Sequence, residues 1–337
     1  MKRVLVTGGA GFIAHHFVKK IIDETDWDIV CLDRLDFSGD LNRLSEIIEE
    51  TQDRQRIQVV HHDLRAEIND SVASRIGHID YIVHIAAGSH VDRSIEDPMS
   101  FVLDNVVGTT NILDYARHRG CEQFIYFSTD EIFGPAPKGV FYSEYDRYNS
   151  TNPYSATKAA AEELVVAYHN TYKLPAIITH TMNVFGERQN VEKFMPLCIR
   201  KILAGESVTI HADPTLTKAG SRHYIHAGDV ADAVLFLMKN TQYDLEIPDH
   251  SHKCQKFNIV GSQEIDNLSL AKMIAKILDK ELKYELTDFH SARPGHDLRY
   301  ALSGERMASI GWTPNTLEET LRQTVLWTIN NPRWLSQ

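Results

Sequence analysis

Three polar side chains that could hold or transfer protons, Thr129, Asp130 and Glu131, follow a short apolar run in the middle of the chain. Residues 124–127 are rich in β-forming types, which indicates a buried strand. Ligands of open α/β sheets bind at the carboxyl ends of the strands, where these side chains are expected. Because adjacent carboxyl groups push their pKa values apart, Asp130 and Glu131 could divide the roles of acid and base.

Tyr154 and Lys158 form a second pair with catalytic potential. Pro153 precedes residues 154–164, a segment of strong helix propensity, so a spacing of four places both side chains on one helix face. An ammonium group that close favours the phenolate and lowers the tyrosine pKa towards working pH, which makes Tyr154 a plausible general base. A tyrosine and a lysine with this spacing are, taken alone, better explained as ordinary surface residues. The prediction therefore depends on the motifs that accompany them.

The chain begins with a strand, a glycine turn and a helix. Residues 3–7 are β-forming, residues 8–14 carry the spacing G-x-x-G-x-x-A, and a helical pattern continues from there. Glycines let the backbone approach a pyrophosphate, and the helix N-terminus supplies N–H donors and the positive end of a dipole. Ala14 stands where glycine is commonest, at some cost in helix–strand packing. The cofactor contacts predicted here are Gly8, Gly11, Phe12 and Ile13.

The second predicted strand, residues 28–32, leads directly into Asp33. An acidic residue at this point accepts hydrogen bonds from the ribose hydroxyls of adenosine and repels a 2′-phosphate. The sequence therefore favours NAD over NADP as the cofactor, although the neighbouring cation Arg34 weakens the distinction.

Further cofactor contacts are expected at the ends of the next two strands. Asp63 and Leu64 follow the third strand, residues 59–62, and are placed to border the adenine. Ala86 is one of the small residues that end the fourth strand, residues 81–87, and these leave room for the cofactor to pass close by.

A polar loop and a long helix follow the fourth strand. The loop, residues 88–94, could line the site near a nicotinamide and a sugar through Ser89, His90 and Arg93. For His90 and Arg93 individually, an ordinary solvated loop is an equally good interpretation. Residues 96–118 have a helical pattern and lead to the strand before Thr129.

The composition is that of a folded, acidic protein. The 337 residues are enough for one large α/β unit or two coupled domains, and the apolar fraction of 43% is ordinary for a globular chain. The formal net charge of −11 and the lack of a basic cluster argue against nucleic acid or an anionic membrane as a partner. No stretch reaches the length of a membrane span, and the N-terminus runs into a strand rather than a signal peptide.

Cysteine and histidine positions favour neither disulfides nor a metal. The four cysteines lie far apart without C-x-x-C spacing, which favours reduced, buried thiols in a cytoplasmic protein. Two adjacent histidine pairs, at residues 15–16 and 61–62, lack the i, i+4 spacing of a helical metal site. We therefore expect no metal.

The order of the predicted elements indicates the fold class. Strands alternate with helices through about residue 180 without an internal repeat, which predicts an α/β fold with a Rossmann-type doubly wound parallel sheet. Residues 1–180 form the expected NAD-binding Rossmann domain. The pattern of residues 181–337 is mixed, so most of them are assigned to a smaller mixed α/β substrate-binding lobe.

Several segments together resemble the extended short-chain dehydrogenase/reductases: residues 7–14, 86–94, 128–131 and 154–158. Within that family the chain is similar to the nucleotide-sugar 4,6-dehydratases, those acting on dTDP-glucose above all, over nearly its whole length. The pair Asp130 and Glu131 is the most discriminating part, because epimerases and reductases of this fold perform no elimination and generally lack it. The resemblance also implies that the chain returns to the Rossmann domain around residues 225–262.

The resemblance places substrate contacts in the C-terminal half. Two strands of the substrate lobe are expected at residues 208–211 and 221–226, paired with each other, and residues 293–297 match the family's R-P-G-H-D segment. The arginine of that segment could bind a phosphate through two charge-assisted hydrogen bonds. The substrate contacts implied here are Asn183, Glu192, Lys193, Arg222, Asn258, Arg293 and His296.

The activity implied is that of a lyase, a hydro-lyase of deoxysugar biosynthesis that regenerates its NAD in each turnover. Tyr154, activated by Lys158, takes the proton of the sugar C4 hydroxyl, which Thr129 holds in line. Glu131 then removes the C5 proton, and Asp130 gives a proton to the departing C6 hydroxyl. The product is a nucleotide-linked 4-keto-6-deoxy sugar.

The partners implied are a nucleotide-diphosphate sugar as substrate and a second copy of the chain. The family forms homodimers through a four-helix bundle, which is expected here from the helices near residues 96–118 and 154–172.

This sequence departs from the family pattern at three places. Gly88 stands where glutamate is usual, Phe133 stands where tyrosine is common, and residues 212–220 are longer than the usual glycine turn. All three lie near the sugar or the base, so the nucleotide and the sugar stay open. A UDP-sugar 4,6-dehydratase and a nucleotide-sugar 4-epimerase or decarboxylase are the alternatives, and a non-catalytic NAD-binding regulator is a distant one.

Overall fold

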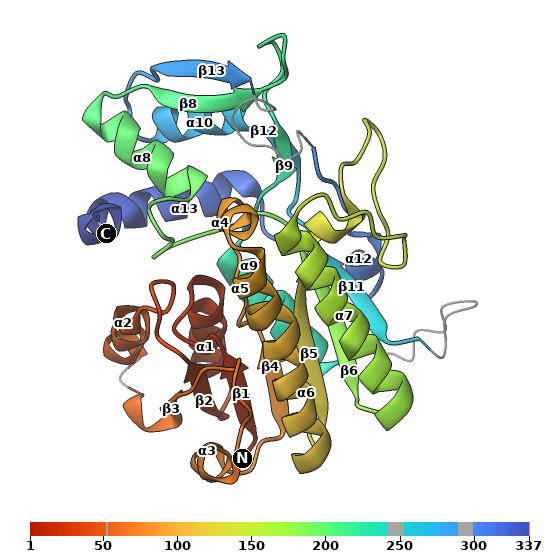
Figure 1. Cartoon of the computed structure of the whole chain (residues 1–337). Helices are drawn as coiled ribbons and strands as arrows, with labels where there is room; N and C mark the ends of the chain where they lie inside the picture. The colour runs from red at the N-terminus through yellow and green to blue at the C-terminus, as the bar shows by residue number, and fades with distance from the viewer. Residues whose placement is uncertain (52, 241–252, 289–298, 337) are drawn as a thin grey trace.

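The core of the molecule is a seven-stranded, fully parallel sheet with the strand order β11-β6-β5-β4-β1-β2-β3 (Figure 1). This computed structural model describes residues 1–51, 53–240, 253–288 and 299–336. The sheet consists of β1 (Arg3–Thr7), β2 (Asp28–Asp33), β3 (Ile57–His61), β4 (Tyr81–His84), β5 (Gln123–Thr129), β6 (Ala176–Thr181) and β11 (Gln255–Ile259). Parallel strands covered on both faces carry nearly continuous apolar runs, as β5 and β6 do. The predicted doubly wound α/β fold is confirmed.

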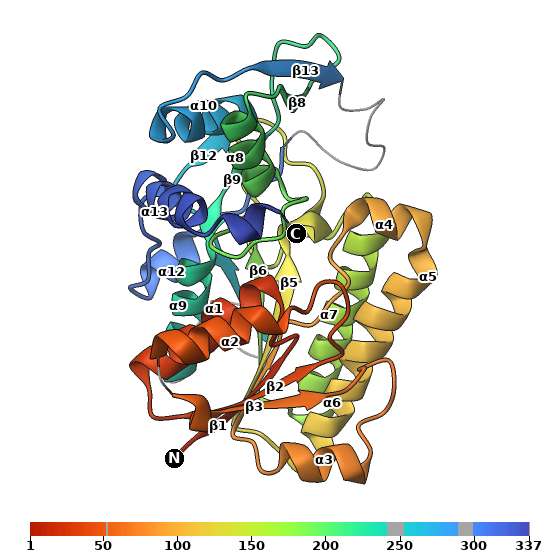
Figure 2. The same ribbon diagram turned by 90° about the vertical axis from the view of Figure 1, so that its left-hand side faces the viewer.

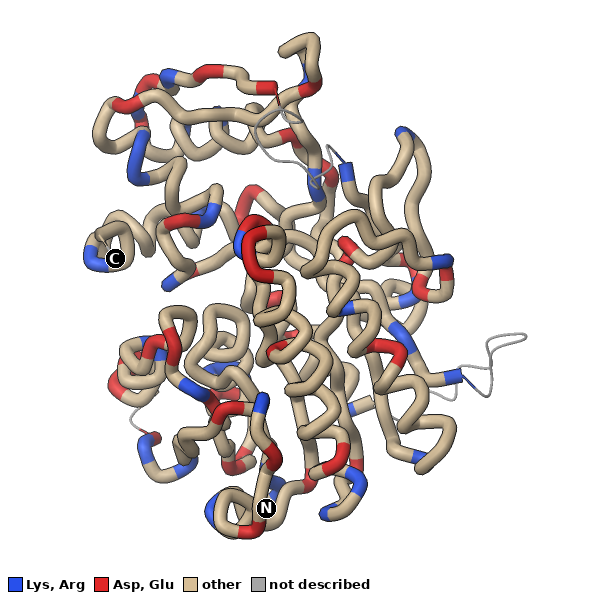
Figure 3. The backbone as a smooth tube through the Cα atoms, viewed as in Figure 1, with Lys and Arg blue, Asp and Glu red and all other residues tan. Residues whose placement is uncertain are grey.

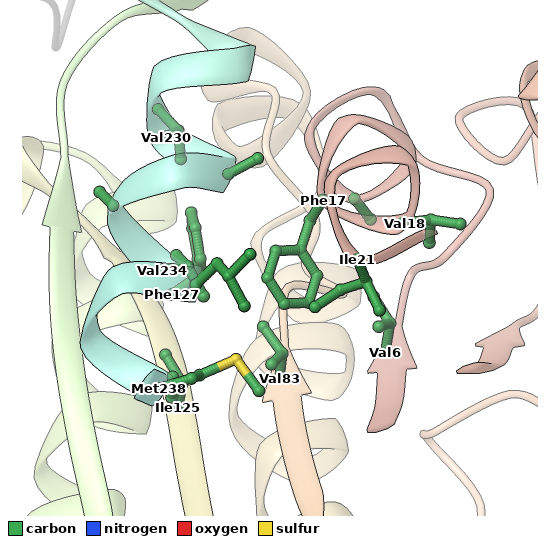
Figure 4. Packing of buried hydrophobic residues seen from close by; sticks show 14 of the residues in the cluster. Val6, Phe17, Val18, Ile21, Val83, Ile125, Phe127, Val230, Val234 and Met238 are labelled. Atoms are coloured by element: carbon green, nitrogen blue, oxygen red, sulfur yellow. The ribbon is translucent and has the colours of Figure 1, made fainter. Parts of the chain in front are cut away.

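Helices cover both faces of the sheet. One face carries α1 (Phe12–Glu24), α2 (Leu41–Thr51) and α9 (Ala227–Lys239), and the other carries α3 (Asp70–Ile76), α6 (Gly108–Arg119) and α7 (Pro153–Tyr172). Figure 4 shows the first face, where Phe17 of α1 and Val234 of α9 meet side chains of β4 and β5. All these side chains are removed from water, so their burial stabilises the layered arrangement.

The predicted single helix over residues 96–118 is wrong in detail. The chain forms α4 (Val91–Glu96), α5 (Pro98–Phe101), a π-helical segment η2 (Val102–Val107) and then α6. Pro98 lacks a backbone N–H, and the side chain of Asp97 accepts a hydrogen bond from the backbone N–H of Ser100 over 3.2 Å. These two residues end one helix and begin the next.

A second, smaller lobe lies beyond the carboxyl ends of the sheet strands (Figures 1 and 2). It contains α8 (Phe194–Ala204), β8 (Val208–Ala212), β9 (Ser221–His223), β12 (Glu264–Asp266), α10 (Asn267–Ile277), β13 (Tyr284–Asp288), α13 (Leu317–Asn330) and η4 (Pro332–Leu335). The predicted pairing of residues 208–211 with residues 221–226 is wrong. β8 pairs in parallel with β13, and β9 pairs antiparallel with β12, because both strands find partners from much later in the chain.

The remaining elements connect the two parts. They are η1 (Arg54–Arg56), η3 (Asp130–Phe133), β7 (Val184–Phe185), β10 (Ile225–His226), which pairs in parallel with β7, and α12 (Glu305–Ser309). After β10 the chain supplies α9 and the edge strand β11 to the Rossmann layer, where a return was expected. The domain boundaries themselves stay a prediction.

Positions of Lys or Arg and of Asp or Glu are interspersed along the backbone of both lobes (Figure 3). Within the described ranges, no helix has both the length and the hydropathy to cross a lipid bilayer. The same residues contain no group of three or more His, Cys, Asp or Glu side chains arranged to hold a metal ion.

Candidate active site

The glycine turn between β1 and α1 suits a pyrophosphate group. Gly8 has a φ of +68°, and a Cβ there would lie 2.9 Å from the Ala86 Cα, just beyond β4. A Cβ on Gly11 would lie 2.9 Å from the carbonyl oxygen of Gly8. Gly11 is the N-cap of α1, and in the described structure no side chain caps this helix. Its free N–H groups therefore suit an anion, while contacts of the half-buried Phe12 and Ile13 with the cofactor stay a prediction.

Asp33 ties the glycine turn to the loop after β2. Its Oδ2 accepts a hydrogen bond from the Ala10 backbone over 3.0 Å, and its Oδ1 accepts one from the Leu35 backbone over 2.8 Å. The carboxylate thus lies between the turn and the loop, at the place predicted for a ribose contact.

Arg34, the neighbouring cation, is engaged by two carboxylates. Its guanidinium donates to both oxygens of Asp104, over 2.5 and 2.9 Å, and to Asp36 over 2.7 Å. A guanidinium held in this way is a poor partner for a 2′-phosphate. The arrangement therefore supports NAD over NADP.

The two residues predicted at the adenine lie beyond β3. Asp63 accepts a hydrogen bond from Arg65 Nε over 2.8 Å, and the carbonyl oxygen of Leu64 accepts one from Asn111 over 2.7 Å. The Leu64 backbone is therefore tied to α6, and contact of either residue with the adenine stays a prediction.

Thr129, Asp130 and Glu131 lie where β5 ends and η3 begins. Thr129 Oγ1 donates to Asp130 Oδ1 over 3.1 Å and accepts a hydrogen bond from the Glu131 backbone over 3.3 Å. Asp130 Oδ2 is buried and has no hydrogen-bond partner in the described part of the chain. Burial, and after it the charge of Glu131, raises the pKa of Asp130 to about 7. Glu131 is half-buried and accepts a hydrogen bond from Asn152 Nδ2 over 3.0 Å, so the two carboxyls have different surroundings.

Tyr154 and Lys158 lie one turn apart on α7, but their electrostatics differ from the prediction. Lys158 Nζ donates to the carbonyl oxygen of Phe127 over 2.5 Å, and burial lowers the pKa of Lys158 to about 7. Burial, followed by the charge of Glu131, raises the pKa of Tyr154 well above its usual value. The predicted lowering of the tyrosine pKa is therefore wrong for this structure, because the ammonium is turned to the backbone and burial dominates.

A buried histidine behind this site was not predicted. His84 ends β4, and its ring nitrogens lie 2.7 Å from Thr7 Oγ1 and 2.9 Å from Thr109 Oγ1. Thr7 Oγ1 also accepts a hydrogen bond from the Ala86 backbone over 3.1 Å. Burial, and after it Lys158, lowers the pKa of His84 to about 3, so the ring is neutral. This network fixes the end of β4 beside the glycine turn.

Two further polar residues position the N-terminus of α7. The Asn152 side chain caps α7 by accepting a hydrogen bond from the Ser155 backbone over 2.8 Å, and its amide also reaches Glu131. Ser94 Oγ accepts a hydrogen bond from the Tyr154 backbone over 3.1 Å. An asparagine directly before a proline is a helix-start signal that sequence reasoning could have used for Asn152. Nothing in the local sequence marks Ser94.

Predicted substrate contacts from two distant segments come together. Arg93 Nη2 lies 3.3 Å from Glu192 Oε2, although 99 residues separate them. Burial, and after it the charges of Lys193 and Arg93, lowers the pKa of His90, so these side chains share one region. The structure therefore brings together four of the residues predicted to bind substrate.

Three other predicted residues lie near the same strand ends. Ser89 and Asn183 are exposed, Ser89 in the loop after β4 and Asn183 between β6 and β7. Arg222 packs over the Tyr300 ring at 4.6 Å, and its charge opposes the upward shift of the Asp130 pKa. Arg222 therefore lies within electrostatic reach of Asp130.

The assignment of Asn258 to the substrate is wrong. Its side chain is fully buried, its Nδ2 donates to the carbonyl oxygens of Tyr142 and Ser303, and its Oδ1 lies 2.8 Å from His180 Nδ1. A side chain that is fully buried and donates both amide hydrogens inside the protein is not available to a ligand. The last two predicted residues, Arg293 and His296, lie outside the described residues.

The sequence matches the NAD dependent epimerase/dehydratase family over residues 4–247. The chain belongs to this family. Among its relatives, the dTDP-glucose 4,6-dehydratase of Escherichia coli is 33% identical, with 98% of this chain and 95% of the relative covered. The dTDP-D-glucose 4,6-dehydratase of Mus musculus is also 33% identical, over 97% of this chain and 88% of the relative.

Solved structures of other family members have the same fold. DesIV, a dTDP-glucose 4,6-dehydratase of Streptomyces venezuelae solved with NAD bound, superposes with a TM-score of 0.84 at 29% identity, covering 98% of both chains. The UDP-N-acetylglucosamine 4-epimerase of Methanobrevibacter ruminantium superposes with a TM-score of 0.83 at 25% identity, covering 98% of this chain and 99% of that one. Dehydratases and epimerases thus share the fold, and the site residues must distinguish them.

Proposed function

We propose that this family member is an NAD-dependent nucleotide-sugar 4,6-dehydratase that converts an NDP-hexose to the NDP-4-keto-6-deoxyhexose. The observation that carries the proposal is the pair Asp130 and Glu131, of which Asp130 is buried and able to hold a proton near pH 7. Elimination of water requires one group that gives a proton and another that takes one. The relatives named as dTDP-glucose 4,6-dehydratases make dTDP-glucose the substrate proposed first.

The residues of the glycine turn fit NAD. Gly8, Gly11 and the N-terminus of α1 would hold its pyrophosphate, and Asp33 would hold the adenosine ribose. NAD held there would supply the hydride acceptor for oxidation of the sugar C4 and, once reduced, the hydride donor for C6.

Tyr154 is the proposed base for the C4 hydroxyl. Its pKa in this structure is too high for that role, so activation requires the Lys158 ammonium to turn from the Phe127 carbonyl towards the phenol oxygen. The two side chains share one face of α7, which makes this reorientation local. Thr129, directly before the carboxyl pair, would hold the hydroxyl in line for proton transfer.

Glu131 and Asp130 would carry the elimination. Oxidation at C4 acidifies the C5 proton, which the Glu131 carboxylate removes while the Asn152 amide holds that carboxylate in place. Asp130 gives its proton to the C6 hydroxyl, which leaves as water. The elimination thus ends with the proton on Glu131 instead of Asp130. Glu131 would return that proton to C5 as the hydride reaches C6, and a proton equivalent to the one that Tyr154 takes from the C4 hydroxyl would restore Asp130 through solvent, so the proton count balances.

Substrate contacts are proposed at the residues that the structure gathers beyond the sheet. Arg222 and Lys193 would pair with the diphosphate, since both are cations near the catalytic strand ends. The remaining proposed contacts are Ser89, His90, Arg93, Asn183 and Glu192.

The test is a mass-spectrometric assay of the purified protein without added cofactor, using dTDP-glucose, UDP-glucose, UDP-N-acetylglucosamine, CDP-glucose and GDP-mannose. Loss of one water from a donor would support the proposal and name the substrate. An isomer of unchanged mass would instead identify a 4-epimerase. Bound NAD without any turnover would identify a non-catalytic regulator.

A homodimer in the cytoplasm completes the proposal. The α5–η2 face exposes Met99, Val102 and Leu103, with exposed fractions of 63%, 36% and 38%. The segments α5, η2 and α6 run beside α7 (Figures 1 and 2), so two copies could form a four-helix bundle over this apolar face. All four cysteines are free thiols, which is usual for a reducing compartment.

A further inference from the structure

A buried cluster of charged residues lies behind the catalytic helix. Glu162 is on α7, one turn after Lys158, and its side chain has no exposed surface. Its carboxylate oxygens Oε1 and Oε2 lie 3.1 and 3.2 Å from His180 Nε2, and Oε1 also lies 2.7 Å from Lys256 Nζ. The Tyr148 hydroxyl also donates to this carboxylate. One carboxyl group thus joins the catalytic helix to strands β6 and β11.

The hydrogen bonds of Asn258 determine one proton of His180. Nδ2 of Asn258 donates to the carbonyl oxygens of Tyr142 and Ser303, both over 3.1 Å, so Oδ1 is the atom that faces His180 Nδ1. An amide oxygen only accepts hydrogen bonds, and therefore His180 Nδ1 must carry a hydrogen.

The Glu162 carboxylate determines the second proton. His180 Nε2 faces both carboxylate oxygens, which accept and do not donate when the group is ionised, so Nε2 must carry a hydrogen too. The opposite assignment, a protonated Glu162 that donates to a neutral ring, would leave the Lys256 ammonium buried without a counter-charge. Although burial opposes it, the charges of His180 and Lys256 hold the pKa of Glu162 well below its usual range. With both nitrogens protonated, His180 is an imidazolium.

The cluster supports both parts of the catalytic site. In the β5–β6 register His180 is the partner of Ser128, the residue before Thr129. The ring of Phe133, which ends the turn that carries Asp130 and Glu131, packs edge-on against the His180 ring with 5.0 Å between centroids. The charged ring therefore lies directly beneath the catalytic turn.

The titratable groups that surround Lys158 come from three elements. Tyr154 and Glu162 lie one turn away on either side along α7, the Tyr126 ring of β5 lies 4.3 Å from Nζ, and His84 of β4 is neutral. Glu162 is the carboxylate whose charge opposes the effect of burial on Lys158. The negative charge of Glu162, which belongs to the buried cluster, thus also helps to keep Lys158 protonated.

We infer that Glu162, His180 and Lys256 are positioning residues, an ammonium–carboxylate–imidazolium cluster that holds the catalytic helix against the strand end with the two catalytic carboxyls. Their effect on turnover rests on the proposed function, whereas the imidazolium state of His180 does not. The Glu162 side chain has no exposed surface with which to contact a ligand, so its loss should change the rate of the bound complex rather than substrate affinity.

The first test is ¹⁵N NMR of the histidine rings in the full-length protein near neutral pH, with the His180 signals assigned by their loss in His180→Asn. Both ring nitrogens of His180 should give protonated-type shifts. A shift of the non-protonated type for either nitrogen would overturn the inference. This measurement uses the wild-type protein, so it holds even if a variant of the cluster fails to fold.

The second test compares Glu162→Gln with Glu163→Gln, a matched control that removes the same charge from an exposed position of the same helix. Glu162→Gln should lower kcat about tenfold, leave KM within about twofold and move the titration of Lys158 in the pH–rate profile to lower pH. Glu163→Gln should do none of these. Wild-type kcat and pH profile in Glu162→Gln would refute the positioning role. If the wild-type protein dehydrates none of the sugar nucleotides but His180 is an imidazolium, the proposed function is refuted and the inference about His180 stands.

Discussion

Asp130 accepts a hydrogen bond from Thr129 over 3.1 Å through Oδ1, while its Oδ2 is buried without a partner in the described structure. A carboxyl in this position suits the proton donor proposed for the pair, and its pKa is about 7 because burial, and after it Glu131, disfavours ionisation. We expect the elimination step to slow as pH rises above about 7, because Asp130 then loses the proton that it must give. The pH dependence of kcat measures this, and a rate that stays level to about pH 9 would contradict it.

Asp130→Asn tests the same role without a change of pH. The amide cannot give a proton, so elimination should slow by roughly 10²-fold or more while the initial hydride transfer changes far less. Single-turnover absorbance of the reduced nicotinamide separates the two steps. Equal slowing of both steps would mean that Asp130 acts in binding rather than as the acid.

The raised pKa of Asp130 also predicts that replacing this carboxyl by a neutral amide stabilises the folded protein. A carboxyl with a folded-state pKa of about 7 and an unfolded-state pKa of roughly 3.9 binds its proton more tightly when folded, so stability falls as pH rises between these values. Asp130→Asn should therefore raise the free energy of unfolding by roughly 2–4 kcal/mol at about pH 8 and by little at about pH 4. Urea denaturation at both pH values measures this. The exposed control Glu206→Gln should change neither value.

Glu131→Gln tests the proposed base of the pair and should separate oxidation from elimination. Glutamine cannot remove the C5 proton, so the reduced nicotinamide should accumulate in a single turnover while product forms roughly 10²-fold more slowly. Asn152→Ala, which removes the amide that holds Glu131, should give a smaller loss in the same step. Elimination at the wild-type rate in Glu131→Gln would refute this assignment. Tyr154→Phe, in contrast, should suppress both steps.

Much of the fold could be predicted because the central strands are buried on both faces. The apolar runs of β1, β2 and β6 indicated their positions closely, since parallel strands carry nearly continuous apolar residues. The pairing of β8 with β13 could not be predicted in this way. Short strands with a solvated face carry little local signal, and their partners were decided by packing between distant segments.

Parts of the site formed by residues adjacent in the sequence could be predicted. Parts formed by contacts between distant elements could not. Asp130 and Glu131 directly follow an apolar run and a Ser-Thr pair in the sequence, so their position at the end of β5 could be predicted. The contact of His180 with Glu162 depends on how β6 lies against α7, which no local pattern shows. Asn258 was misassigned for the same reason, because an asparagine near a strand end can face the ligand or the interior.

The bidentate contact between Arg34 and Asp104 predicts that removal of Asp104 shifts the cofactor preference from NAD towards NADP. Asp104→Ala would remove both hydrogen bonds, over 2.5 and 2.9 Å, and leave the guanidinium beside the ribose site with Asp36 and the more distant Asp63, at 3.9 Å, as carboxylate partners. The Kd for NADP should then fall by about tenfold relative to that for NAD, since arginine pairs well with phosphate. Calorimetric titration with both dinucleotides measures the ratio. Adding Arg34→Ala should abolish the gain, and an unchanged ratio in Asp104→Ala would show that Asp33 alone rejects the 2′-phosphate.

The exposed apolar face of α5 and η2 predicts the oligomeric state. If two copies pack over this face, Val102→Glu combined with Leu103→Glu places four charges in one symmetric interface and should convert the dimer to a monomer. Light scattering coupled to gel filtration measures the mass. Leu203→Glu is the matched control, because Leu203 lies on α8 with a similar exposed fraction of 42% and should leave the mass unchanged. A wild-type protein that is already monomeric at micromolar concentration would contradict the homodimer, and a dimer that survives both substitutions would place the interface elsewhere.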